Sequence, residues 1–168
     1  MTDSSLLQRV GDRLRAADAM VAAAESSTGG LLCSRLTDVP GSSDYFDRGV
    51  VSYSNAAKVE VLGVESATLD EYGAVSEPTA REMATGVREL ADAAWGVSTT
   101  GVAGPGGGTP RTPVGTVYIG VAHRDGVASA NRYEFAGTRQ ECKRQFARQA
   151  LADLLDAVES RDGDEGSN

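Results

Sequence analysis

Apolar positions recur every three or four residues in several stretches of the chain, which is the spacing of one face of a helix. The first predicted helix is capped by Asp3 or Ser4 and continues to about residue 17. A strong start signal, Ser76-Glu77-Pro78, opens another helix. The remaining predicted helices cover residues 31–36, residues 56–62 and a segment from Thr138 to about residue 158.

Shorter apolar runs between turn residues predict strands at residues 20–24, 49–53 and 95–100. Residues 115–122 alternate between apolar and polar positions, and Asp125-Gly126 turns this strand into a partner that ends at Phe135. The early strands alternate with helices, whereas the last two form a hairpin. This order predicts an α/β fold: a three-layer α/β/α sandwich with a mixed, mostly parallel sheet that contains an antiparallel hairpin.

A length of 168 residues fits one hydrophobic core, and the chain shows no internal repeat. We expect a single domain over residues 1–160 and a disordered polar tail over residues 161–168. Residues 101–113 are rich in glycine and proline but lie between two predicted strands, so we interpret them as a functional loop or as a run of turns.

A net charge of −8 argues against nucleic acid as a partner, because phosphate backbones attract basic proteins. The acidic surface fits either a salt-adapted protein or ordinary solubility. Cys33 and Cys142 lie far apart and suggest neither a disulfide framework nor a zinc site. Because no apolar segment is long enough for a membrane span or a signal core, we expect a cytoplasmic protein that does not bind membranes.

The common catalytic signatures are missing from the sequence, including the phosphate loop, GxSxG, HExxH and SxxK. His123 is the only histidine and follows a hairpin strand, so a Ser-His-Asp triad is not expected. A serine nucleophile would then need another base, and a lysine with a lowered pKa can take that role. Lys58 is one of only two lysines, but its scarcity alone also fits a surface residue.

Ser26 follows a predicted strand and precedes Thr28, Gly29 and Gly30 at the start of a helix. Free backbone N–H groups at such a helix start can stabilise an oxyanion or bind a phosphate. The same residues also suit an ordinary helix cap, and the local sequence leaves both interpretations open.

Three ordered motifs in the first half of the chain resemble those of the CinA C-terminal domain family. Residues 24–30 (AESSTGG) are similar to its AESCTGG, residues 41–43 to its GSS, and residues 53–58 (YSNAAK) to its YSNxxK. Ser27 stands where that family usually has cysteine.

Three further motifs follow in the same order. Residues 73–78 resemble GAVSEP, residues 100–105 resemble TGIAGP, and residues 113–117 resemble the end of KPVGTV, with threonine before the proline. The resemblance covers about residues 5 to 158 and implies membership in a family that includes nicotinamide mononucleotide deamidases of pyridine nucleotide salvage.

The resemblance implies a catalytic set. Ser26 would be the nucleophile, Lys58 the group that takes its proton, and Tyr53 a hydroxyl that relays or steadies that proton. Attack on the carboxamide would give an acyl-enzyme and ammonia, and water would then release nicotinic acid mononucleotide without a metal or organic cofactor.

The resemblance also implies a set of substrate contacts. Arg139 is expected to anchor the substrate phosphate, although Arg144 and Arg148 lie on the same predicted helix and remain alternatives. The other expected contacts are Thr28, Gly29, Gly30, Ser43, Asn55, Thr100, Gly101 and Gly104.

Two other functions compete with the amidohydrolase. The domain can be a non-catalytic nucleotide-binding or regulatory module, or a DNA-related competence factor, which the acidic charge disfavours. Larger relatives carry an additional N-terminal domain with pyrophosphatase activity, and we expect this chain to be the stand-alone form. Family members commonly pair, so a homodimer is expected.

Overall fold

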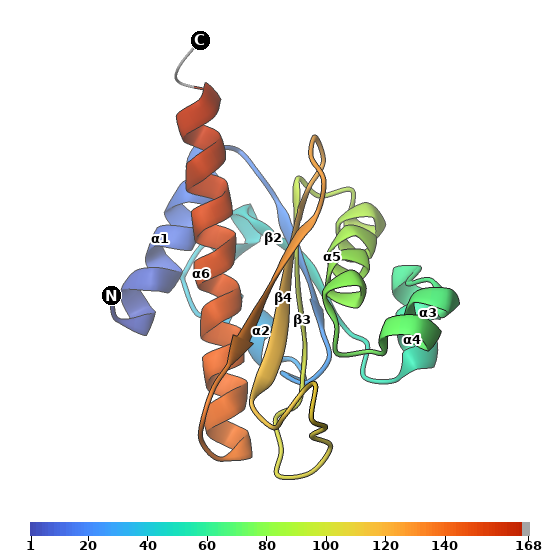
Figure 1. Ribbon diagram of the computed structural model, residues 1–168. Helices are drawn as coiled ribbons and strands as arrows, with labels where there is room; N and C mark the ends of the chain where they lie inside the picture. The colour runs from blue at the N-terminus through green and yellow to red at the C-terminus, as the bar shows by residue number, and fades with distance from the viewer. Residues whose placement is uncertain (166–168) are drawn as a thin grey trace.

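The computed structural model describes residues 1–165 and forms one mixed sheet between two layers of helices (Figure 1). The strands are β1 (Val21–Glu25), β2 (Phe46–Val51), β3 (Trp95–Gly101), β4 (Thr116–His123) and β5 (Ser129–Glu134). Their order in the sheet is β2-β1-β3-β4-β5. Strand β1 is parallel to both of its neighbours, β2 and β3, whereas the pairs β3–β4 and β4–β5 are antiparallel.

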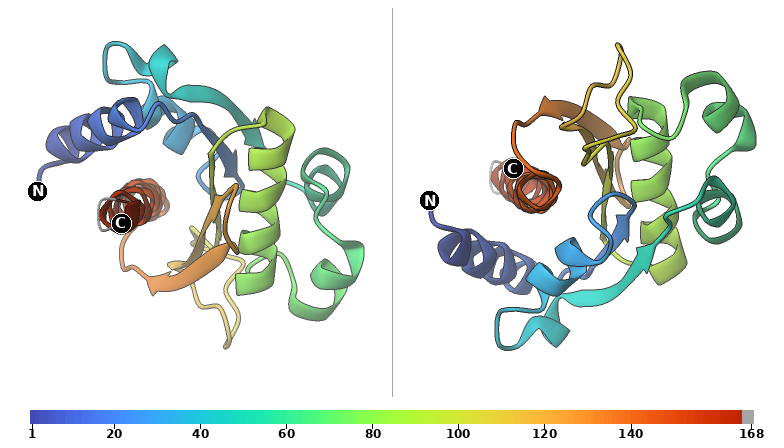
Figure 2. Two further views of the ribbon diagram at one scale, coloured as in Figure 1. Left: turned by 90° about the horizontal axis from the view of Figure 1, so that it is seen from above. Right: turned by 90° about the horizontal axis from the view of Figure 1, so that it is seen from below.

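Helices cover both faces of this sheet, as Figure 2 shows from above and below. One layer contains α1 (Asp3–Ala16), α2 (Leu31–Leu36) and α6 (Arg139–Glu165). The other contains α5 (Glu77–Ala91), against which α3 (Asn55–Leu62) and α4 (Ser66–Tyr72) pack. The predicted sandwich with an antiparallel hairpin is therefore confirmed, and two of the four strand pairings are parallel.

Strand β1 divides the core because successive side chains of a strand point to opposite faces. Val21 and Ala23 pack into the core on the side of α1 and α6, whereas Ala22 and Ala24 pack into the core on the side of α5. All of these side chains are fully buried, which explains why β1 is a continuous apolar run rather than an alternating one. The same alternation sets the directions of the next two side chains, those of Glu25 and Ser26.

Several boundaries differ from the sequence prediction. Strand β2 begins at Phe46 rather than at residue 49, and α4 was not predicted at all. The first helix is capped by Thr2, whose hydroxyl accepts from the backbone N–H of Ser5, rather than by Asp3 or Ser4.

Helix α6 continues beyond the end that the sequence predicted. Residues 161–165 are helical, although they were expected to belong to a disordered tail. Arg161 donates to Asp125 at 3.1 Å, which ties this last part of the helix to the turn between β4 and β5. The rest of the expected tail, residues 166–168, lies outside the described residues. None of the helices within residues 1–165 is both long and apolar enough to span a bilayer.

Candidate active site

A pocket of about 290 Å³ lies beside the carboxyl ends of β1 and β3. Such crevices at the strand ends of α/β sheets commonly hold ligands. Its polar lining consists of Ser26, Ser27, Tyr53, Lys58, Thr100 and Arg139. The remaining wall comes from residues 74–75 and from the glycine-rich loop at residues 101–104, 106 and 107. In Figure 1 this loop lies at the lower end of the molecule, near the beginning of α6.

Ser26 and Lys58 meet inside this pocket. The Lys58 Nζ lies 3.0 Å from the Ser26 Oγ and 2.8 Å from the backbone carbonyl oxygen of Ser52. Ser26 is the first residue after β1, and Lys58 lies on the first turns of α3, 32 positions later. The separation is within the range that a nucleophile and its base require.

Burial changes the chemistry of Lys58. Its side chain is only 1% exposed, and no carboxylate among the described residues forms an ion pair with its ammonium group. Desolvation lowers the pKa of Lys58 to about 8 because a charged amine loses hydration when it is buried. About a tenth of the molecules therefore hold a neutral Lys58 at pH 7, which is the form that can accept a proton.

The turn after Ser26 does not offer the open helix start that the sequence suggested. The backbone N–H of Gly30 donates to the Glu25 carboxylate at 3.1 Å, and those of Leu32 and Cys33 donate to it at 2.9 and 3.0 Å. The N–H of Gly29 donates to the carbonyl oxygen of Ser26 at 3.1 Å. These N–H groups are already used within the chain, so they are not free to bind an oxyanion or a phosphate.

Ser27 lines the pocket and carries polar groups that have no hydrogen-bond partner among the described residues. Its backbone N–H has no hydrogen-bond acceptor within the described part of the chain. Its hydroxyl oxygen is also buried without a partner among these residues. Because Ser27 immediately follows Ser26 and lines the same pocket, its N–H is a donor that a developing oxyanion can use.

Arg139 begins α6 and closes one side of the pocket. Its guanidinium donates to the Gly104 carbonyl oxygen at 2.7 Å and to the Tyr53 hydroxyl at 3.2 Å. It thereby connects α6, the glycine-rich loop and the segment after β2. Thr100 also lines the pocket, and its hydroxyl donates to the Ala74 carbonyl oxygen at 2.7 Å.

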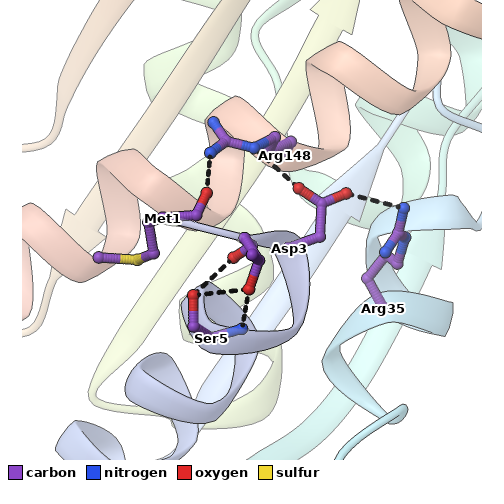
Figure 3. Close-up of polar contacts among 6 residues, drawn as sticks. Met1, Asp3, Ser5, Arg35 and Arg148 are labelled. Atoms are coloured by element: carbon purple, nitrogen blue, oxygen red, sulfur yellow. Dashed lines mark hydrogen bonds and ion pairs between the residues drawn. The ribbon is translucent and has the colours of Figure 1, made fainter.

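The other two arginines considered for the phosphate lie away from the pocket lining. Arg148 donates to the Asp3 carboxylate at 2.8 Å and to the Met1 carbonyl oxygen at 3.0 Å, and Arg35 approaches the same carboxylate (Figure 3). Arg148 therefore holds the amino terminus against α6. Arg144 is exposed and is not among the pocket-lining residues.

Not every expected contact residue reaches the pocket. Ser43 lies in a short 3-10 turn, Ser42–Asp44, just before β2, whereas the pocket lies beyond the other end of that strand. Asn55 lines a separate hollow between α3 and α4. Thr28 is fully buried and donates to Glu25 at 2.5 Å. Gly101 and Gly104 line the pocket, and their contact with the substrate stays a prediction.

Sequence reasoning missed three contributors to this arrangement. Ser52 supplies the carbonyl that holds Lys58, Glu25 accepts the N–H groups of the turn, and Ser27 brings its unused donor to the pocket. Glu25 carried a signal that could have been used, because a carboxylate at the end of a buried apolar strand needs several donors.

Comparison with known proteins identifies the family. The CinA C-terminal domain matches residues 3–158, which is nearly the whole chain. The chain belongs to the CinA C-terminal domain family. Solved structures agree: a CinA superfamily protein from Klebsiella pneumoniae is 36% identical, with a TM-score of 0.90 over 95% of this chain and 99% of that one. The competence/damage inducible protein CihA from Agrobacterium tumefaciens is 38% identical, with a TM-score of 0.89 over 95% and 97% of the two chains.

Two kinds of curated relative share this domain. A CinA-like protein from Chlorobium limicola is 52% identical over 89% of this chain, but the match covers only 36% of that protein. The chain thus spans about a third of the length of such relatives. The nicotinamide-nucleotide amidohydrolase PncC of Enterobacter agglomerans is 49% identical, and the match covers 82% of this chain and 84% of that protein.

Proposed function

We propose that this protein is an amidohydrolase that converts nicotinamide mononucleotide to nicotinic acid mononucleotide and ammonia. The observation that carries the proposal is the 3.0 Å approach of the Lys58 Nζ to the Ser26 Oγ inside a pocket. The similarity to a full-length nicotinamide-nucleotide amidohydrolase over 84% of its chain supports this choice of substrate.

The first half of the reaction acylates Ser26. Neutral Lys58 accepts the hydroxyl proton as the Ser26 Oγ attacks the carboxamide carbon, and the Ser27 N–H donates to the oxygen that becomes negative. The ammonium form of Lys58 then returns the proton to the leaving nitrogen. The carbon–nitrogen bond breaks, ammonia leaves, and an ester links the nicotinoyl group to Ser26.

The second half regenerates the enzyme. Lys58, neutral again after giving its proton to the leaving nitrogen, accepts a proton from a water molecule that attacks the ester carbon. The Ser26 Oγ leaves and takes that proton back from Lys58. The acid product departs, and the water has supplied the hydroxyl that replaced the amine. This cycle requires a single base and no cofactor.

The ribose of the substrate separates its phosphate from the carboxamide. A cation that binds the phosphate must therefore lie about a ribose length away from the reacting group. Arg139 lines the pocket, and its guanidinium has donors beyond the two that bind Gly104 and Tyr53. We propose that it binds the phosphate together with the surrounding glycine-rich loop. Tyr53 has no hydrogen bond to Ser26 or Lys58 among the described contacts, so its role as a proton relay stays a prediction.

The test is a direct assay of the purified protein. Incubation with nicotinamide mononucleotide should release ammonia and nicotinic acid mononucleotide in equal amounts, and Ser26→Ala should abolish both while the circular dichroism spectrum is unchanged. Loss of a nucleophile typically lowers kcat by several orders of magnitude. Tight binding of the nucleotide without any ammonia release would instead support a regulatory module.

Two predictions about the cellular form stay open. The sequence pattern predicts a cytoplasmic location, and the family resemblance predicts a homodimer. Light scattering coupled to size exclusion should give twice the chain mass of 17.4 kDa for a dimer, and a monomeric mass would contradict it.

A further inference from the structure

Beneath the nucleophile lies a buried carboxylate that the proposed mechanism does not use. Glu25 is the last residue of β1, is 0% exposed and forms no ion pair with any described residue. Isolated buried carboxylates are costly unless donors surround them. The hydrogen bonds that Glu25 accepts therefore indicate the role of this residue.

Four donors from one short segment converge on Glu25. Its Oε1 accepts from the Thr28 hydroxyl at 2.5 Å and from the N–H groups of Gly30 and Leu32, and its Oε2 accepts from the N–H of Cys33. Thr28 donates its single hydroxyl hydrogen to Glu25, so Thr99 must be the donor in the 2.8 Å contact between the two threonine hydroxyls. The carboxylate thus fixes the whole turn and also connects it to β3.

Glu25 replaces the cap that α2 lacks. The residue before α2 is Gly30, with a φ of 102°, and it has no side chain to accept the first N–H groups of the helix. A carboxylate from the preceding strand takes that role, and the helix dipole favours its negative charge there. Only six residues form α2, so little else within the helix holds this turn in place.

Strand geometry couples this cap to the nucleophile. Alternation along β1 directs Glu25 toward the core that contains Val21 and Ala23, and the next residue, Ser26, toward the opposite side, where Lys58 meets it. The two adjacent side chains therefore point to opposite faces of the sheet. A shift of the turn at Glu25 would move the backbone of Ser26 and the N–H of Ser27 together.

We propose that Glu25 is a positioning residue for the nucleophile. Its carboxylate holds the turn so that the Ser26 Oγ stays next to Lys58 and the Ser27 N–H stays open to the pocket. The inference rests on the proposed function for its kinetic readout, but the reactivity of Ser26 can be measured without the natural substrate. Misplacement of reacting groups by about 1 Å can lower a rate on the order of 100-fold.

The decisive variant is Glu25→Gln, which keeps the shape of the side chain but places an NH₂ group against at least one backbone N–H donor. We expect kcat on nicotinamide mononucleotide to fall on the order of 100-fold while KM changes by less than about threefold. The rate at which a fluorophosphonate probe phosphonylates Ser26, with loss of fluoride, should fall in parallel. The pH of half-maximal activity should stay the same, because burial rather than Glu25 lowers the pKa of Lys58.

Asp153→Asn is the matched control. Asp153 is a second buried carboxylate, 8% exposed on α6, and it accepts side-chain hydrogen bonds from Asn131, Tyr133 and Gln149 away from the pocket. This control should lower Tm but leave kcat and the probe rate within about twofold of the wild type. Rates are compared well below the Tm of each variant. A similar loss of kcat in both variants would mean general destabilisation and would overturn the proposal.

Thr28→Val provides the test if Glu25→Gln does not fold, since it removes one donor to the carboxylate without a change in shape. We expect a several-fold lower kcat and probe rate. Wild-type values for both would overturn the positioning role. If the wild-type protein releases no ammonia, the proposed function fails, but the probe rates still decide whether Glu25 positions Ser26. An unchanged probe rate in Glu25→Gln contradicts the proposal regardless of the substrate.

Discussion

Tyr53 and Arg139 lie 86 positions apart in the chain, yet the Arg139 guanidinium donates to the Tyr53 hydroxyl at 3.2 Å beside the pocket. Tyr53 is 63% exposed and reaches this contact from the segment between β2 and α3. The same guanidinium also holds the glycine-rich loop through Gly104. We therefore propose that Tyr53 positions Arg139, while its role in the proton path between Ser26 and Lys58 stays a prediction.

Tyr53→Phe tests this assignment. Removal of one exposed hydrogen bond is worth about 1 kcal/mol, so we expect kcat/KM on nicotinamide mononucleotide to fall by less than about tenfold. The pH profile should be unchanged, because the Lys58 environment is intact. A loss of kcat on the order of 100-fold together with an altered pH profile would restore Tyr53 as the proton relay.

Arg139→Ala should remove discrimination between the nucleotide and its riboside. A charge-assisted contact to phosphate is worth roughly 1.5–3 kcal/mol, so kcat/KM for nicotinamide mononucleotide should fall by about 10- to 100-fold. The kcat/KM for nicotinamide riboside should change much less. Arg144→Ala, at the exposed arginine of the same helix, is the matched control and should keep the wild-type preference. Preserved discrimination in Arg139→Ala would place the phosphate elsewhere.

Ser27→Ala separates the hydroxyl of this residue from its backbone N–H. The hydroxyl is buried without a partner among the described residues, and such a group costs about 1–3 kcal/mol. The alanine variant should therefore raise the free energy of unfolding by about 1 kcal/mol in urea titrations, and Thr116→Val, at the other such hydroxyl, should act in the same direction. Because the N–H is retained, kcat should stay within a few fold. A large drop in kcat/KM would show that the hydroxyl contacts the substrate.

The sequence predicted most of the fold because the central strands are buried on both faces. Apart from Glu25, β1 and β3 are therefore continuous runs of small or apolar residues. The start of β2 was missed because this edge strand is largely exposed and carries Asp47 and Arg48. Helix α4 was missed because Leu69 is its single buried residue, which leaves no apolar stripe to detect.

The candidate site could be predicted from the sequence only in part. Motif resemblance brought Ser26 and Lys58 together, and the structure places them in contact. The motif resemblance did not reveal which N–H groups of the turn are free, because that depends on the tertiary contacts of Glu25. Proximity in sequence was also misleading: Asn55 lies three positions before Lys58, but it begins α3 and faces a different hollow.

Lys58→Arg distinguishes a base from a fixed positive charge. Arginine keeps the charge and approximate reach but stays protonated at all working pH values, so kcat should be as low as in Lys58→Ala. In the wild type, kcat/KM should rise about tenfold per pH unit below the Lys58 pKa of about 8 and level off above it. Substantial activity of the arginine variant would assign the proton to a water molecule or to Tyr53.

The same pKa shift predicts that Lys58 lowers the stability of the fold. The pKa is about 8 in the folded protein, against an ordinary lysine value of 10.5, so the unfolded chain binds more protons between these two pH values. The free energy of unfolding should therefore rise with pH across this window, by up to about 3 kcal/mol in total.

Lys58→Met removes the titrating group and fills similar space. The variant loses the contact to the Ser52 carbonyl oxygen, which offsets part of the gain. It should still be about 1–2 kcal/mol more stable than the wild type at pH 7. This advantage should vanish above about pH 10.5, where the wild-type lysine is neutral in both states. Lys143→Met controls for removal of a lysine from an acidic chain and should show no such gain. Urea titrations of the three proteins at pH 7 and at pH 10.5 measure the difference. An equal gain for Lys58→Met at both pH values would show that the stability change comes from packing rather than from the buried charge.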